Sequence, residues 1–163
     1  MQTITPFLWF DNNAEEAMKF YIALFKKGGR KRSKVLKVDR YGDAGPGPAG
    51  TVMAASFLLD GQEFIALNGG PRFKFTEAIS FVINCKNQKE TDYFWNNLAK
   101  DGGEESMCGW VKDKFGLWWQ VVPTELNKLL RHRNPEKAKS AMMAMLQMKK
   151  IDIAGLKNAV AGK

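Results

Sequence analysis

The chain has 163 residues, 45% hydrophobic and 26% charged, with a net charge of +8, which is typical of a globular protein of one domain or two short modules. No apolar run reaches the ~18 residues of a membrane span, so no membrane association is expected. The single histidine, His132, excludes a histidine-rich metal site, and the two cysteines, with an N-terminus that lacks a signal-peptide pattern, predict a reducing cytoplasmic location.

Two segments of the chain repeat each other at an offset of 74 residues, so that residues 5–21 align with residues 79–95. The alignment matches two pairs at the predicted helix starts: Asn13 with Asn87, and Glu16 with Glu90. An Asn followed three positions later by Glu is the pattern of a capping box. Both segments are therefore predicted to be a strand that runs into a capped helix.

Apolar residues recur at helical spacing in both predicted helices and are expected to form the core. They are Ala14, Ala17, Met18, Tyr21 and Phe25 in the first helix, and Thr91, Phe94, Trp95 and Leu98 in the second.

β-rich runs follow each predicted helix after a pair of glycines. Strands are predicted near 34–41, 51–59 and 62–68 in the first half, and near 104–112 and 117–122 in the second, with a further strand near 103–107 left open. Asp60-Gly61 is a hairpin signal, and residues 114–116 are expected to make the matching turn. The chain is thus predicted to be an α+β protein of two tandem β-α-β-β-β modules.

Residues 26–40 hold eight Lys or Arg against one Asp, and residues 126–163 hold nine against one Glu and one Asp. Basic strips that bind nucleic acid usually interleave aromatic residues with the charges, and here only Tyr41 follows the first segment closely. The segment 26–40 is therefore interpreted as solvated, and nucleic acid is not an expected partner.

Residues 124–163 have a helical pattern. Asn134 before Pro135 predicts a helix start with Asn134 as the N-cap, and a methionine-rich apolar stripe follows. We interpret this stripe as packing on its own domain or on a second copy, although such a helix can also bind a partner. The predicted parts are a first module at 1–70, a second at 71–123 and the tail at 124–163, within one structural domain.

Three segments carry a resemblance to a known family: residues 66–71 (ALNGGP), 79–81 (ISF) and 108–123 (CGWVKDKFGLWWQVVP). Together with the tandem modules, they make the chain similar to the PhnB-like branch of the vicinal-oxygen-chelate (glyoxalase/bleomycin-resistance) superfamily. The tail segment 144–153 also resembles this branch. The resemblance implies a glyoxalase-like fold with a C-terminal helical tail.

This branch often carries the label 3-demethylubiquinone-9 3-methyltransferase. A methyltransferase of the common type needs a Gly-rich turn that leads from a strand into a helix and binds S-adenosylmethionine. Residues 68–71 (NGGP) follow a predicted strand but lead toward another strand. No S-adenosylmethionine-site motif therefore supports the label.

The resemblance also implies a cup formed by the two sheets, in which four His, Gln or Glu side chains usually hold a divalent metal. The matching positions in this chain fall near Ile4, Ile65, Ala78 and Gln120. Three apolar side chains and one amide cannot hold a catalytic cation, and positions one residue away are no better. We therefore expect neither a metal nor another cofactor.

The cup is expected to persist as a binding site for an organic molecule. Strand alternation places Trp118 and Gln120 on the face that looks into the cup, and Ser80, Val82 and Asn84 share that parity. The predicted ligand-binding residues are Asn68, Ser80, Cys108, Trp110, Trp118 and Gln120. A structural hydrogen bond is an equal alternative for Ser80 and Gln120, and Trp110 either lines the mouth of the cup or packs in the core.

Cys108 is the one candidate nucleophile. A reactive cysteine needs a nearby cation or helix N-terminus, and Lys112 is the nearest cation in sequence. A buried and inert Cys108 is the simpler interpretation, and Asp113 is expected to cap the turn before Gly116. No catalytic residue is assigned.

These inferences favour a PhnB-like protein that binds a small organic ligand without a metal, and they leave open whether it is an enzyme. Two alternatives remain: a metal-dependent isomerase, lyase or dioxygenase of the superfamily, or a protein that binds nucleic acid through residues 26–40 and the tail. The resemblance also implies a homodimer, with halves exchanged between chains as one arrangement.

Overall fold

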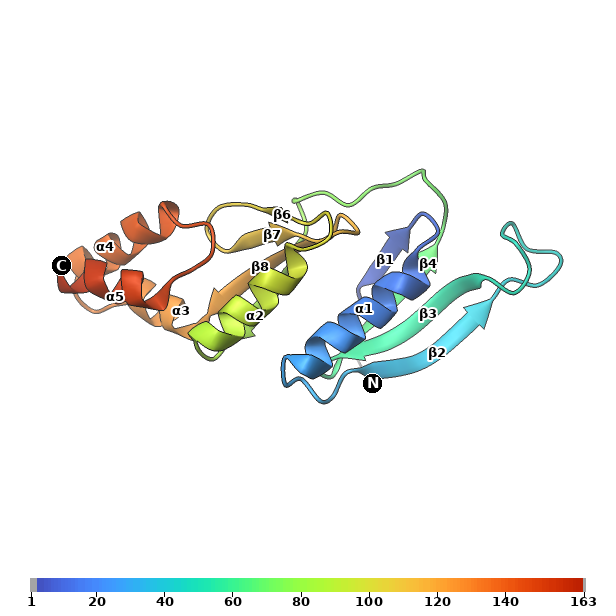
Figure 1. Cartoon of the computed structure of the whole chain (residues 1–163), viewed down its shortest axis with the longest axis horizontal. Coiled ribbons are helices and arrows are strands. Elements are labelled where there is room, and N and C mark those ends of the chain that lie inside the picture. The colour runs from blue at the N-terminus through green and yellow to red at the C-terminus, as the bar shows by residue number, and fades with distance from the viewer. Residues whose placement is uncertain (1–2, 163) are drawn as a thin grey trace. The chain divides into compact units, whose positions relative to one another are not determined.

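The computed structural model describes residues 3–162, so the N-terminal stretch used in the cytoplasmic prediction is only partly described. The chain forms two compact units, residues 1–75 and residues 76–163. Each unit contains one four-stranded sheet, and the tail helices belong to the second unit (Figure 1). Within residues 3–162, no helix combines the length and the apolar content needed to cross a lipid bilayer.

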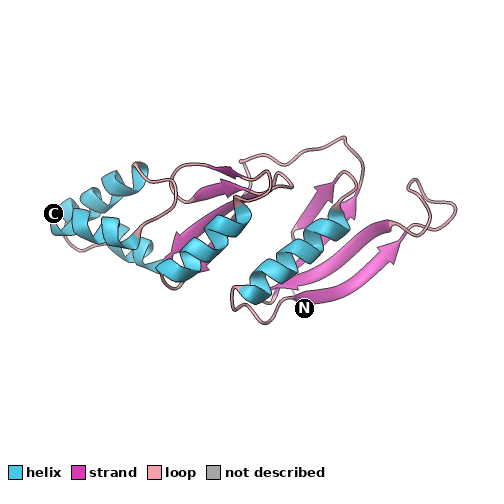
Figure 2. Ribbon diagram, viewed as in Figure 1, coloured by secondary structure: helices cyan, strands magenta, loops and turns pink. Residues whose placement is uncertain are grey.

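The first unit is one β-α-β-β-β module (Figure 2). Its elements are β1 (Phe7–Phe10), α1 (Ala14–Lys27), β2 (Lys34–Arg40), β3 (Val52–Leu59) and β4 (Gln62–Asn68). The strands lie in the order β1-β4-β3-β2, with β1 parallel to β4 and the other pairs antiparallel. Helix α1 packs on one face of this sheet, mainly against β3 and β4, so the opposite face has no helix of this unit on it.

The second unit repeats this module and adds three helices. Its elements are β5 (Phe81–Cys85), α2 (Gln88–Leu98), β6 (Glu104–Glu105), β7 (Trp110–Lys112), β8 (Trp118–Pro123), α3 (Thr124–Leu130), α4 (Pro135–Leu146) and α5 (Ile153–Ala161). The strand order is β5-β8-β7-β6, which matches the first unit strand for strand. The prediction of an α+β fold with two tandem β-α-β-β-β modules and a helical tail is confirmed.

The predicted strand near 104–112 is broken into β6 and β7, and this part of the prediction was wrong. Between the two strands, Cys108 and Gly109 have positive φ angles of 58° and 83°, which turn the backbone out of the extended region. Trp110 N–H then donates to the carbonyl of Met107 across this turn.

The helix faces that periodicity predicted as core are buried in both units. All nine predicted residues are at most 7% exposed. Alternate strand residues pack beneath the helices in the same way: Leu8 and Phe10 in β1, Ile83 and Cys85 in β5, and Trp119 and Val121 in β8. Each unit therefore has its own core between one helix and one face of one sheet.

The two predicted capping boxes have different outcomes. At α2, Asn87 Oδ1 accepts from Glu90 N–H at 3.0 Å, as predicted, and the Glu90 carboxylate accepts from the N–H of Lys86. At α1, Asn13 makes no side-chain capping bond, so that prediction was wrong. The first N–H of α1, from Ala14, instead donates to Asn68 Oδ1 at 2.8 Å, because β4 ends beside the start of the helix.

The C-terminal helices pack on the second unit. Val122, Leu126, Ile151 and Leu156 form a buried cluster, and Met145 and Met148 of the predicted stripe pack against it. The backbone N–H groups of Cys108 and Gly109 donate to the carbonyls of Met148 and Lys149, both at 2.7 Å. Lys150 also forms an ion pair with Asp92 of α2 at 2.8 Å, and its hydrogen bond lowers the pKa of that carboxyl. Part of the stripe therefore packs on its own unit, while Met142, Met143 and Leu146 are exposed.

Candidate functional site

The face of the second sheet opposite α2 carries the side chains that parity predicted for the cup. In β8, Trp119 and Val121 are buried beneath α2, whereas Trp118 and Gln120 alternate with them and are half-buried. We call this surface the open face of the second sheet. It is formed by Val82 and Asn84 of β5, Trp110 and Lys112 of β7, and Trp118 and Gln120 of β8.

Ser80 and Gln120 meet at one edge of this open face. Gln120 pairs with Val82 in the parallel β5–β8 register, which brings its side chain next to Ser80, just before β5. The Nε2 group of Gln120 donates to Ser80 Oγ at 2.9 Å. The amide oxygen of Gln120 and the hydroxyl proton of Ser80 keep hydrogen-bonding capacity for a ligand. The structure thus brings together two residues that lie 40 positions apart in the sequence.

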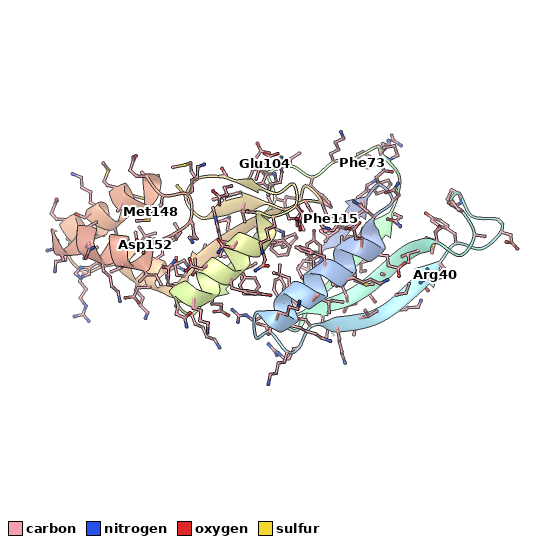
Figure 3. The ribbon with its side chains drawn as sticks, viewed as in Figure 1. Arg40, Phe73, Glu104, Phe115, Met148 and Asp152 are labelled. Atoms are coloured by element: carbon pink, nitrogen blue, oxygen red, sulfur yellow. The ribbon has the colours of Figure 1, made fainter. Side chains whose placement is uncertain are left out.

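Two tryptophans and an ion pair lie along the same face. The rings of Trp110 and Trp118 contact each other edge to face, with centroids 6.4 Å apart. Lys112 Nζ lies 5.8 Å from the centroid of a Trp118 ring and 2.6 Å from Oε1 of Glu104 in β6. Glu104 is labelled in Figure 3. Sequence reasoning did not assign Lys112 and Glu104 to the site, although the parity of Lys112 with Trp110 could have indicated the first of them.

Cys108 is held in the turn before β7 by its backbone. Its φ angle is 58°, its N–H donates to the Met148 carbonyl, and its side chain is half-buried. The contact with the tail therefore sets the position of Cys108. Lys112, the cation that could have activated the thiol, forms an ion pair with Glu104. The role of Cys108 toward a ligand stays a prediction.

The amide group of Asn68 is bonded at both ends within the first unit. Its Oδ1 accepts from Ala14 N–H, and its Nδ2 donates to the Val52 carbonyl at 2.9 Å. Its backbone carbonyl accepts from the Tyr41 hydroxyl at 2.8 Å. Asn68 therefore ties the start of α1 to β3 and β4, and any ligand contact would have to come from the outer surface of this bridge.

The four positions matched to the superfamily's metal ligands do not provide a metal-binding set. Ile4 is 83% exposed and precedes β1, and Ala78 precedes β5, while Ile65 lies within β4 opposite Phe7. Gln120 is the only one of the four with a donor atom, and this is an amide. Across residues 3–162, no three or more His, Cys, Asp or Glu side chains gather where they could hold a metal ion. The residues present therefore do not fit the divalent metal that the fold family implies.

The basic segment 26–40 is tied to the hairpin after β3. Arg30 NH1 lies 3.3 Å from Asp60 Oδ2, and Arg32 NH2 donates to the Asp60 carbonyl at 2.9 Å. Ser33, which is fully buried, donates to the Arg30 carbonyl and accepts from Asp60 N–H. Two of the arginines that could contact phosphate are thus bound within the unit, and the expectation that nucleic acid is not a partner stays a prediction.

Comparison with known proteins gives a family match over most of the chain. The sequence model of a family described as 3-demethylubiquinone-9 3-methyltransferase matches residues 2–122. No protein with a curated function matches the chain.

Several solved structures are similar to this chain, and the first two below support the same fold. The PhnB protein of Bacillus cereus is 37% identical to this chain over 76% of this chain and 100% of that protein, with a TM-score of 0.67. A protein from Pseudomonas aeruginosa is 23% identical over 73% of this chain and 95% of its own, with a TM-score of 0.58. A glyoxalase/bleomycin resistance protein from Albidiferax ferrireducens is 17% identical over 72% of this chain and 95% of its own, with a TM-score of 0.45.

Proposed function

This chain belongs to the PhnB-like family described as 3-demethylubiquinone-9 3-methyltransferase, and from that premise we propose that it binds a small organic ligand on the open face of its second sheet without a metal. The observation that carries this proposal is the set of side chains on that face. Two tryptophan rings, one amide–hydroxyl pair and one Lys–Glu ion pair lie on adjacent strands. Aromatic surface with a few fixed polar groups is the usual composition of a small-molecule site.

The name of the family does not supply the activity of this chain. After β4, residues 69–80 contain no helix, so Gly69 and Gly70 do not open the kind of strand–helix turn that binds S-adenosylmethionine in the common methyltransferase fold. The sheet of each unit also contains both parallel and antiparallel strand pairs, whereas the sheet of that methyltransferase fold is mostly parallel. A ligand with apolar surface and one or two polar groups fits the open face better than a methyl-donor cofactor.

The proposal is tested by metal analysis of the purified protein, together with a thermal-shift screen of divalent ions and small metabolites. We expect substoichiometric metal, no shift with divalent ions, and stabilisation by at least one metabolite, because a ligand that binds only the folded state raises the melting temperature. One tightly held ion per chain would contradict the proposal and restore a metal-dependent enzyme of the superfamily as the better reading.

Two matched serine variants locate the binding site of any stabilising metabolite. Ser80→Ala removes the hydroxyl that accepts from Gln120, and we expect it to weaken binding by about three- to tenfold. Ser140→Ala makes the same change on α4 of the same unit, where the hydroxyl donates to the Glu136 carbonyl, and should leave binding unchanged. Equal losses in both variants would argue against a site on the open face.

We propose that the protein is a homodimer. Each sheet has one face that the helix of its own module does not cover, and apolar side chains near these faces are exposed, with Phe7 at 57% and Val82 at 51%. Because the two halves form separate compact cores, they allow exchange of halves between two chains. Light scattering after size exclusion should give twice the chain mass, and a mass of one chain would contradict the dimer.

A further inference from the structure

The first unit contains a hollow of about 520 Å³ that none of the preceding proposals uses. It lies where β1 and β4 end, and the loop 42–50 between β2 and β3 forms part of its wall. Its lining includes Trp9 and Tyr41, the carboxylate of Asp11, and the prolines at 46 and 48. We call it the first-unit hollow.

The two rings of the first-unit hollow are fixed by their polar atoms. Trp9 Nε1 donates to the Gly70 carbonyl at 2.9 Å, and the Tyr41 hydroxyl donates to the Asn68 carbonyl at 2.8 Å. Phe73 packs edge-on against Trp9, with ring centroids 5.0 Å apart (Figure 3). Because the N–H and O–H groups of Trp9 and Tyr41 already have partners, what these rings can offer a ligand is their π surface.

Glycines let the backbone lie directly against these rings. A Cβ atom at Gly69 would overlap the Trp9 ring, and a Cβ atom at Gly47 would overlap the Tyr41 ring. The loop is closed at its base, where Tyr41 N–H donates to the Thr51 carbonyl and Gly50 N–H donates to the Tyr41 carbonyl, both at 2.9 Å. The loop 42–50 thus folds around Tyr41, and the backbone at Gly47 contacts the Tyr41 ring with no side chain between them.

Several polar groups of the lining are already paired within the first unit. The N–H groups of Gly69 and Gly70 donate to the carbonyls of Phe10 and Asp11, and the Thr51 hydroxyl donates to the Pro48 carbonyl. Prolines at 46 and 48 have no N–H to offer. The Asn68 amide is bonded at both ends, whereas Asn12, which also lines the hollow, is exposed and has an amide with donor and acceptor atoms.

The charge of the lining is the opposite of the charge of the chain. Asp11 is a lining residue, and no Lys, Arg or His is, although the chain carries a net charge of +8. Two cations that are close in sequence to lining residues are engaged by other groups. Arg40, at the end of β2 (Figure 3), contacts the Gly50 carbonyl and Glu15, and Arg72 stacks over Phe73.

We propose that the first-unit hollow binds an organic cation, an alkylated or methylated ammonium group, between Trp9 and Tyr41 and beside the carboxylate of Asp11. A cation over the face of Trp or Tyr is attracted by the ring quadrupole, and quaternary ammonium ions need no hydrogen-bond donor or acceptor from the site. An anion would meet Asp11 and no lining cation. The proposal does not depend on the ligand of the second sheet.

The test compares choline with its neutral isostere 3,3-dimethyl-1-butanol, in which carbon replaces the charged nitrogen. Both are titrated into the full-length protein, and the shift of the Trp9 indole N–H is followed by NMR, with Trp9→Phe used to assign the signal. We expect choline to bind about tenfold more tightly than the isostere, because only the charge differs. Equal binding of the two compounds, or no movement of the Trp9 signal with choline, would overturn the proposal.

Two matched Asp variants separate the local charge from the charge of the whole chain. Asp11→Asn should weaken choline binding about five- to tenfold. Asp43→Asn removes the same charge from the loop 42–50 without touching the lining, and should change binding less than twofold. Equal effects of the two variants would overturn the assignment to the first-unit hollow, and an unchanged melting temperature of both variants shows that they remain folded.

Discussion

Replacing Asp113 by Ala is expected to lower the free energy of unfolding by about 3 kcal/mol. Asp113 is 1% exposed and accepts three hydrogen bonds in the turn between β7 and β8. Its Oδ1 accepts from the N–H groups of Phe115 and Leu117, and its Oδ2 accepts from Trp119 Nε1 at 2.8 Å. The variant leaves these donors without their acceptor, and the indole of Trp119 is itself only 1% exposed.

The prediction can be checked by urea unfolding. The second readout is the melting temperature, which should fall by roughly 6–12 °C. Asp113→Asn keeps one acceptor for the two backbone groups but turns an amide donor toward the indole, so we expect about half the loss. Asp43→Ala, an exposed Asp in loop 42–50, serves as the control and should change stability by less than about 0.5 kcal/mol. If Asp113→Ala cost no more than this control, the buried carboxylate would not be organising the turn.

Replacing Ile151 by Ala should cost about 3 kcal/mol, because it opens a cavity in the cluster that joins the tail to the second sheet. Ile151 is fully buried with Val122, Leu126 and Leu156. Its backbone carbonyl accepts from Gln88 Nε2 at 3.0 Å, and this bond should survive the substitution. The loss therefore reports side-chain packing alone.

The position of the tryptophans allows this experiment to test whether the tail is part of the second unit's fold. All five lie before residue 124, so tryptophan fluorescence reports the two modules, whereas far-ultraviolet circular dichroism also reports α3, α4 and α5. We expect the two signals to shift together in Ile151→Ala. Ile153→Ala, two positions later and only half-buried, is the matched control and should cost about 1 kcal/mol or less. A shift in circular dichroism alone would show that the tail unfolds independently.

Local sequence patterns were sufficient for the architecture of the modules. The 74-residue repeat predicted both β-α-β-β-β units, and helical periodicity predicted nine of the eleven buried residues of α1 and α2, missing Ile22 and Leu24. Alternation in β8 predicted that Trp119 is buried while Trp118 and Gln120 share the open face. These features follow from the 3.6-residue and two-residue periods of helix and strand, which depend only on neighbours in the chain.

Capping was predictable where the partner is local and not where it is distant. At Asn87 the acceptor and the donor lie three residues apart, and the expected bond forms. At α1 Asn13 makes no such bond, and the partner that meets the first N–H of the helix, from Ala14, is Asn68, 54 residues away. The strand break at Cys108 was missed for the same reason, since the carbonyls that hold this turn come from Met148 and Lys149 in the tail.

The sequence by itself determined the family, the two modules and the lack of metal-ligand side chains at three of the four expected positions. Only the tertiary structure decided what those modules bring together: Gln120 beside Ser80, Lys112 between Glu104 and Trp118, and Asp113 beneath Trp119. The first-unit hollow belongs to the second group as well, because Trp9 lies on β1 and Tyr41 directly follows β2, and these strands are not neighbours in the sheet. Such contacts depend on sheet register and on how loops close, and neither is encoded in the spacing of residues along one segment.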